Sequence, residues 1–217
     1  MNFDFLPKYY LFFLNGAKFT LLLAFFTVLF GVLLGLFLAM MRISKSKFLN
    51  LISTAYIEFI RGTPVLVQLY IIYYALPNLL GVNLPDLVAA VLALSINSSA
   101  YVAEIIRAGI QAIDKGQMEA ARSLGMTQSM AMRYIIIPQS IKNILPALGN
   151  EFIVVIKESS IVSVIGIHEL MYNADTVRGN TFRPFEPLII AALMYFVMTF
   201  TLSKIMGAVE RRMRAGD

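Results

Sequence analysis

The sequence predicts an all-α polytopic membrane protein with five transmembrane helices. Hydrophobic residues make up 59% of its 217 residues and charged residues only 14%, whereas soluble domains are roughly half apolar and a quarter charged. Residues Phe19 to Met41 carry no charge, and this run exceeds the roughly 20 residues that cross a bilayer. A secretory signal has a shorter apolar core of roughly 7 to 15 residues, so we expect the first span to be retained.

Four more apolar segments follow the first one. We place the second span from about Pro64 to Leu80, the third from Leu87 to Ile106, the fourth from about Leu145 to Ile167 and the fifth from Pro187 to Gly207. Thr63 can cap the helix that Pro64 begins, and Pro187 suits the first turn of a helix. Five crossings place the two termini on opposite sides of the membrane.

The distribution of Lys and Arg predicts the orientation, because cytoplasmic loops carry an excess of both. With the N-terminus outside, 13 of the 18 positively charged residues fall on the inner side. These are Arg42, Lys45, Lys47, Arg61, Arg107, Lys115, Arg122, Arg133, Lys142, Lys204, Arg211, Arg212 and Arg214. The charges are dispersed and form no basic face with interleaved aromatic residues, so we expect no nucleic-acid partner.

A polar segment between the third and fourth spans is predicted to form a helical hairpin on the cytoplasmic side. Asp114 and Gln117 have the spacing of a capping box, and Gly125 suits the left-handed position that ends a helix. Thr127 can cap a second helix. Pro138 is expected to end that helix, because its ring blocks continuation.

The first helix of this hairpin, which covers about residues 114–138 in all, has a smooth side. Ala120 and Ala121 carry almost no bulk, so another surface can approach the backbone closely, and Glu119 and Arg122 add charge beside them. An ordinary cytoplasmic loop made of good helix formers is the alternative.

Polar residues inside the third span lie on one helical face. Asn97, Tyr101 and Glu104 recur at intervals of four and three residues, with Ser98 and Ser99 close by. This stripe can line an aqueous path, or it can form hydrogen bonds to neighbouring helices, and both interpretations stay open for Asn97 and Ser99. We expect Glu104 to have a structural role in pairing with nearby arginines.

The fourth span contains two adjacent ionisable residues, Lys157 and Glu158. They point about 100° apart on a helix, so they cannot form an ideal ion pair with each other. Ser159, Ser160 and Gly166 follow, which favours a locally broken helix that faces a cavity. We expect Glu158 to contact a cationic group of the substrate. The predicted substrate path comprises Gln68, Asn97, Ser98, Tyr101, Glu158 and Ser160.

Several motifs resemble those of one transporter family. Glu119-Ala120-Ala121, followed by Gly125 and by Ile135-x-Ile137-Pro138, resembles the EAA signature of ABC importer permease subunits, with Ile137 where leucine is usual. The segments EFIRGTP (58–64), AYVAE (100–104) and KESS (157–160) look like those of polar amino-acid permeases. Together these motifs cover most of the chain from about residue 50 to residue 170, in the order of the family.

The resemblance implies a single permease domain, residues 1–217, with the type I ABC importer fold in a bacterial inner membrane. The hairpin would be the coupling helix, and Glu119, Ala120, Ala121 and Gly125 would transmit motion from the ATPase. The implied partners are two cytoplasmic ATPase subunits, a second permease subunit, an extracellular substrate-binding protein and a polar amino acid. Transport would proceed by alternating access, and Glu158 favours a basic substrate such as arginine, lysine or histidine.

The chain is expected to be no enzyme and to bind no cofactor of its own. It has no G-x-x-x-x-G-K-[ST] phosphate-binding motif, so ATP and Mg²⁺ would be bound by the partner ATPase. No metal site is expected, because the chain has no cysteine and only one histidine, His168. The alternatives are a self-sufficient secondary transporter or channel, for which Lys157 and Glu158 would be coupling groups, and a purely structural membrane subunit.

Overall fold

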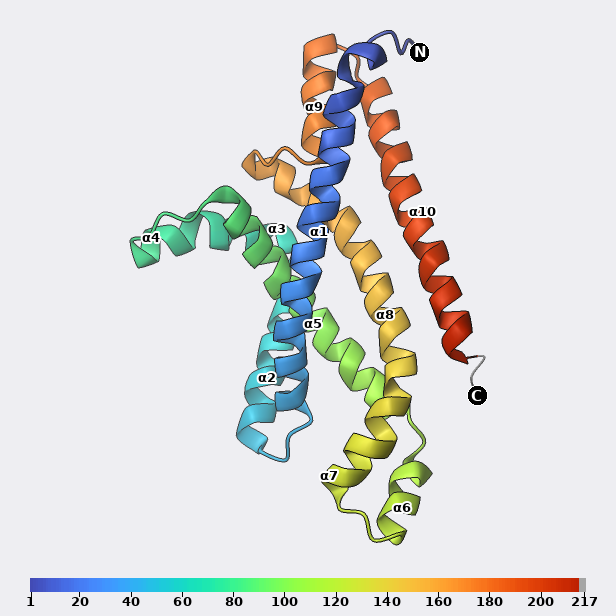
Figure 1. Cartoon of the computed structure of the whole chain (residues 1–217). Coiled ribbons are helices and arrows are strands. Elements are labelled where there is room, and N and C mark those ends of the chain that lie inside the picture. The colour runs from blue at the N-terminus through green and yellow to red at the C-terminus, as the bar shows by residue number, and fades with distance from the viewer. Residues whose placement is uncertain (215–217) are drawn as a thin grey trace.

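The computed structural model describes residues 1–214, and within them the chain is entirely helical apart from its connections. The last three residues of the predicted domain lie outside the described residues. Figure 1 shows the N-terminus at one end of an elongated bundle and the short helices α6 and α7 at the other. The helices are α1 (Leu6–Arg42), α2 (Lys47–Arg61), α3 (Val65–Tyr70), α4 (Leu76–Leu80), α5 (Asp86–Gln111), α6 (Lys115–Ser123), α7 (Gln128–Ala131), α8 (Ile137–Glu158), α9 (Leu170–Thr181) and α10 (Glu186–Arg214).

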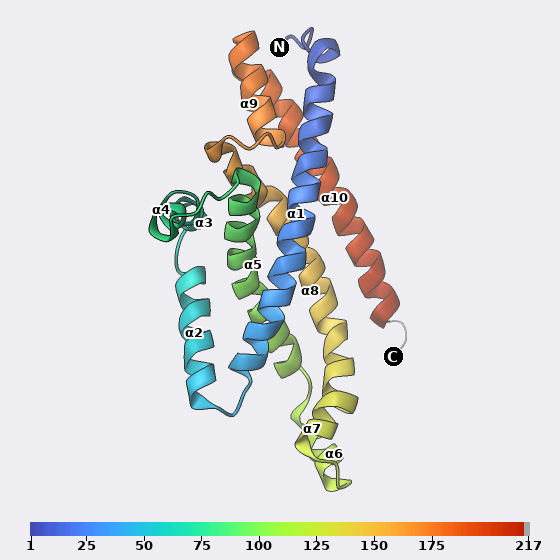
Figure 2. The same ribbon diagram turned by 60° about the vertical axis from the view of Figure 1, so that its left-hand side comes forward.

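Three helices of the described chain, α1, α5 and α10, are each long and apolar enough to cross a membrane. They contain the predicted first, third and fifth spans. The predicted second span, from about Pro64 to Leu80, covers only the second half of a bent pair of helical segments. There the chain bends by 106° between α2 and the segment Val65–Leu80, and Figure 2 shows α3 and α4 lying across the direction of α2.

The bend has a local cause in the segment Gly62-Thr63-Pro64. Pro64 has extended backbone angles (φ −62°, ψ 135°), and a proline both lacks an N–H and restricts the residue before it. Helix α2, whose 15 residues include several polar ones, was not predicted. The broken pair α2 and α3–α4 takes the place of the predicted single helix.

The helical chain continues past Pro138, contrary to the expectation that this proline ends a helix. A π-helical turn, Met132–Ile136, directly precedes Pro138, and the chain then continues as α8. The same arrangement occurs before Pro77, which follows the π-helical turn Ile71–Ala75. A proline ring clashes with the carbonyl four residues earlier, and the wider π-turn relieves this clash.

The helix of the predicted fourth span begins earlier than expected and is broken at its C-terminal end. Helix α8 starts at Ile137 rather than Leu145 and ends at Glu158, and a 3₁₀-helix then runs from Ser159 to Ile165. Gly166 follows with a φ of 83°, in the left-handed region that glycine adopts without strain. The predicted break after the two serines is therefore present.

Helix α1 packs closely and in parallel along α5. The Ser95 hydroxyl donates to the Thr27 carbonyl at 3.2 Å, and a Cβ on Gly35 would lie 2.6 Å from Val102 Cγ1. Glycine at this position lets the two backbones approach. Helices α8 and α10 pack beside this pair and complete the bundle.

Candidate functional site

A buried polar cluster lies at the break between α2 and α3. The Gln68 amide nitrogen donates to the Ile60 carbonyl at 2.8 Å and to the Thr63 hydroxyl at 2.9 Å. The Gln68 amide oxygen accepts a hydrogen bond of 3.1 Å from the Asn97 side chain on α5. Gln68 therefore satisfies carbonyls left free by the break and joins them to α5.

The next residue on α5, Ser98, connects this cluster to α8. Its hydroxyl donates to Glu151 Oε1 at 2.8 Å, and Glu151 is only 8% exposed. Glu151 was not among the predicted site residues. A carboxylate within an apolar span was the available signal, because ionisable residues at that depth are functional candidates by default.

Two carboxylates line the same side of α8. Glu151 and Glu158 are seven residues apart, so both point to one helical face about two turns from each other. Within residues 1–214, neither the Glu151 nor the Glu158 carboxylate makes a salt bridge of 4.0 Å or less. Arg61 contacts Glu104 instead, and the Lys157 side chain is exposed. The predicted path residue Ser160 is half-buried, and its hydroxyl donates to the Lys157 carbonyl at 2.7 Å.

Glu104 holds three arginines that lie at or near the C-terminal ends of α1, α2 and α5. Its carboxylate lies 2.8 Å from Arg107, 3.1 Å from Arg42 and 3.9 Å from Arg61. The Arg61 guanidinium also sits over the Tyr101 ring, 5.5 Å from its centroid. The predicted structural role of Glu104 fits this geometry, whereas Tyr101 contacts Arg61 rather than the hydrogen-bonded cluster.

The structure thus separates the predicted path residues into groups. Gln68 and Asn97 are hydrogen-bonded to each other, whereas Ser98, the next residue on α5, bonds to Glu151 on α8. Ser99 bonds to the Tyr56 hydroxyl at 2.9 Å on α2, which is interhelical bonding rather than path lining.

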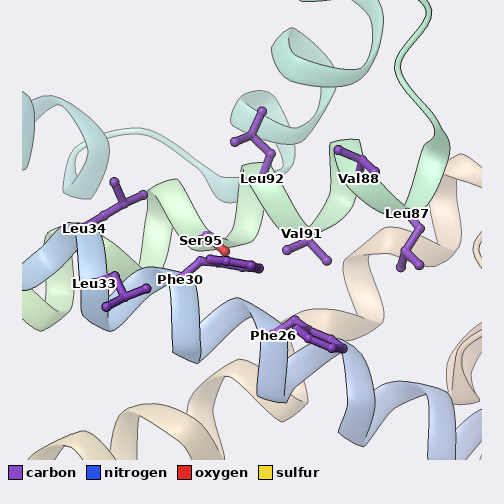
Figure 3. Close-up of a pocket in the computed structure, with 9 residues that line it drawn as sticks. All are labelled: Phe26, Phe30, Leu33, Leu34, Leu87, Val88, Val91, Leu92 and Ser95. Carbon is purple, nitrogen blue, oxygen red and sulfur yellow. The ribbon is translucent and has the colours of Figure 1, made fainter.

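The only oxygen-bearing side chain in the groove between α1 and α5 is that of Ser95. Figure 3 shows Phe26, Phe30 and other hydrocarbon side chains around it, and the groove encloses about 640 Å³. Ser95 and Asn97 are separated by about 200° around α5, so the groove opens away from the polar cluster. An apolar groove on that side can hold lipid tails but lacks groups that would recognise a polar substrate.

The hairpin between α5 and α8 forms at the end of the molecule opposite the N-terminus (Figures 1 and 2). The Asp114 carboxylate accepts from the Gly116 backbone N–H at 2.7 Å, and Thr127 caps α7. Gly125 has a φ of 86° at the corner. The reciprocal half of the predicted capping box is missing, because Gln117 instead accepts a hydrogen bond from Gln139 at 3.3 Å.

The surface of the hairpin differs in part from the expected smooth patch. Glu119 and Ala120 are exposed, but Ala121 is buried between α6 and the second helix. Adjacent residues point about 100° apart on a helix, so only one of the two alanines can face outward here. Leu124, which was not predicted, is 84% exposed next to the corner.

Comparison with known proteins bears on the whole chain. The family described as binding-protein-dependent transport system inner membrane component matches residues 31–215. The chain is 41% identical to a putative glutamine transport system permease protein, GlnP, of Rickettsia felis, over 97% of this chain and 98% of that one. It is 45% identical to the arginine transport system permease protein ArtQ of Bacillus subtilis, over 95% and 94%.

A solved structure shows the same fold. A chain in the crystal structure of an amino acid ABC transporter with histidines is 60% identical and superimposes with a TM-score of 0.93. The match covers 98% of this chain and all of the other.

Proposed function

This chain belongs to the binding-protein-dependent transport system inner membrane component family, as an amino-acid ABC transporter permease, and we propose that it imports basic amino acids by alternating access. The observation that carries this proposal is the pair Glu151 and Glu158 on one face of α8, free of salt bridges of 4.0 Å or less within the described residues. A carboxylate in a span is costly unless it is paired or wet. A cationic substrate would supply the missing positive charge.

The names of similar proteins leave the substrate open among polar amino acids. One relative is called a glutamine permease and another an arginine permease, and the solved transporter is described with histidines. Gln68, Asn97 and Ser98 offer neutral hydrogen-bonding groups that suit the substrate's amino and carboxylate ends. The two acidic side chains favour arginine, lysine or histidine over glutamine.

Uptake by charge-neutralised variants tests the substrate assignment. Glu158→Gln and Glu151→Gln keep the side-chain size and remove the charge. A hydrogen bond to a charged group contributes about 1.5–3 kcal/mol, so we expect the half-saturation concentration for arginine uptake to rise roughly 10- to 150-fold. The matched control is Asp175→Asn, which removes an exposed carboxylate paired only with Arg178. Unchanged uptake and substrate ranking in both variants would refute the assignment.

The proposed mechanism requires ATP to be hydrolysed by other subunits. Two ATPase subunits would bind ATP and Mg²⁺, dock on the hairpin at about residues 114–138 and drive two permease copies between inward- and outward-facing states. Glu119, Ala120 and Leu124 would contact the ATPase, while Ala121 and Gly125 would keep the hairpin in shape. A shift of the two states from 1:99 to 99:1 needs roughly 5.5 kcal/mol, so the hairpin must transmit force without yielding.

The single domain would cross a bacterial inner membrane five times, with the N-terminus outside and the C-terminus in the cytoplasm. The crossings would be α1, the broken pair α2 and α3–α4, α5, α8 and α10. Helix α8 is not among the described helices that are long and apolar enough to cross a membrane by composition, but its packing against α1, α5 and α10 supports its place in the bundle.

Reconstitution separates this mechanism from a secondary transporter. Proteoliposomes that contain the permease, its ATPase subunits and its binding protein should accumulate labelled arginine only with internal ATP. Uptake that persists after the ATPase subunits are omitted would favour the self-sufficient transporter instead.

A further inference from the structure

The turn between α1 and α2, residues 43–46, is fixed by its own hydrogen bonds. The Ser46 backbone N–H donates to the Ser44 hydroxyl at 3.2 Å, and the Ser46 hydroxyl caps α2 by accepting from the Leu49 backbone N–H at 3.5 Å. The Asn50 side-chain amide, one turn into α2, donates to the Arg42 carbonyl at the end of α1. These bonds join the two helix ends, so the turn is an ordered element of the fold.

A cationic pocket of about 420 Å³ lies along this turn and the start of α2. Its lining contains no acidic side chain and comprises Ser44, Lys45, Lys47, Asn50, Leu51 and Thr54. Among the described residues, neither Lys45 nor Lys47 makes a salt bridge of 4.0 Å or less. The next acidic residue of α2 is Glu58, about 16 Å farther along the helix, and it lies 4.0 Å from Arg42. The two lysine charges of the pocket are therefore uncompensated within the described chain.

Beside this pocket, α2 turns an apolar stripe outward. Four large hydrophobic side chains on one side of the helix are between 43% and 69% exposed: Phe48, Leu51, Ile52 and Phe59. Their spacings of three, four and seven residues place them on one helical face. The opposite side of α2 packs on α1 and α5, and its buried residues are Ser53, Ile57 and Ile60. The exposed stripe thus begins at the pocket and follows α2 away from it.

The length of the uncharged run in α1 places the pocket at the depth of lipid headgroups. Phe19 to Met41 span about 35 Å at 1.5 Å per residue, compared with about 30 Å of hydrocarbon in a bilayer. The run ends just before Arg42, so the turn lies at the polar boundary of the membrane, whichever leaflet that is. Figure 2 shows the turn at the same end of the bundle as the hairpin, which extends farther. From this boundary α2 runs back beside α1, so its apolar stripe lies at the level of the acyl chains.

We propose that the pocket binds the phosphate group of an anionic phospholipid, such as phosphatidylglycerol, whose acyl chains lie along the apolar stripe of α2. Lys45 and Lys47 supply the positive charge. The Ser44 hydroxyl accepts its bond from Ser46 and keeps its own proton for a phosphate oxygen. Basic pockets at the membrane surface recognise lipid headgroups, and the adjoining stripe matches the tails of the same molecule. A soluble anion would fill the pocket and leave the stripe bare. This inference does not depend on the substrate or the mechanism proposed above.

Native mass spectrometry of the complete transporter, titrated with phosphatidylglycerol, tests the cationic pocket. The double variant Lys45→Gln with Lys47→Gln removes both charges at exposed positions. Each lysine near an anionic lipid contributes a factor of about five, so the affinity for the most tightly held lipid should fall roughly 25-fold. The matched control, Lys8→Gln with Lys18→Gln, changes the net charge equally at exposed positions elsewhere on α1 and should leave that affinity unchanged. Equal lipid retention by the double variant and the parent would overturn the proposal, as would equal affinity of the parent for phosphatidylcholine and phosphatidylglycerol.

Two further measurements distinguish the lipid from other occupants. A large excess of inorganic phosphate should leave the lipid bound, and its displacement would show that the pocket takes a soluble anion instead. Because the chain has no cysteine, Phe48→Cys places a single thiol on the stripe. Oxidation of this variant in nanodiscs should give no disulfide-linked permease dimer, since lipid covers the stripe. A linked dimer would show that a second copy covers it and would overturn the proposal.

Discussion

The contact between α1 and α5 depends on Gly35, and Gly35→Ala tests whether the two helices pack as described. A methyl group there would lie 2.6 Å from Val102 Cγ1 and 2.8 Å from the Ser99 carbonyl oxygen. Optimal separations between carbon atoms are about 3.5–4.0 Å. Because one obstacle is backbone, rotation of a side chain cannot remove the clash, and the helices must move apart.

Overpacking of this kind costs about 1–3 kcal/mol. For a chain of this size each kcal/mol corresponds to about 2–4 °C, so the apparent melting temperature should fall by roughly 2–12 °C. The measurement is the loss of monodisperse protein on heating in detergent, followed by size-exclusion chromatography. Gly179→Ala is the matched control, because it also lies in a helix but has no atom within 4 Å of the added methyl group.

A second substitution sharpens the test. Val102→Ala removes the methyl groups nearest to Gly35, so the double variant Gly35→Ala with Val102→Ala should recover part of the loss, as expected for residues in contact. A Gly35→Ala variant that melts within about 1 °C of the parent would show that the α1–α5 packing described above is incorrect.

Three further predictions address other parts of the chain. Ala121→Leu should disrupt the packing of the hairpin and thereby abolish binding-protein-stimulated ATPase activity, and this activity is the measurement, because circular dichroism of the isolated hairpin cannot replace it. Ala120→Leu should instead alter only the affinity for the ATPase subunits, measured in a pull-down titration. Glu169→Ala removes the cap of α9, where the carboxylate accepts from the Tyr172 backbone N–H at 2.7 Å, and also the hydrogen bond of 2.7 Å from the Tyr195 hydroxyl on α10. It should lower the melting temperature by about 2–8 °C for a cost of about 1–2 kcal/mol; an unchanged value would contradict the tie between α9 and α10. Glu104→Gln leaves three arginines without their carboxylate and should destabilise the contact of α1, α2 and α5 by roughly 1–3 kcal/mol, discounted for partial exposure; the loss should be larger at low salt than at high salt if the remaining arginines repel one another.

Local sequence features predicted much of the hairpin and the three uninterrupted long helices. Capping by Asp114 and Thr127 and the left-handed Gly125 depend on residues within a few positions of each other, and the structure shows all three. Apolar runs longer than the bilayer is thick likewise identify α1, α5 and α10. The helix after Thr127 was misjudged at Pro138, because a π-turn can accommodate a proline that an α-helix cannot.

Composition and motif order were enough to identify the class of protein, because both follow directly from the order of residues along the chain. Which polar groups share a site depended on the tertiary structure. Glu151 gains its importance from Ser98 on another helix, and Ala121 is buried by the packing of the hairpin on itself. Hydrogen bonds and packing between residues far apart in the chain leave no periodic pattern in the sequence, so only the folded arrangement could decide these features.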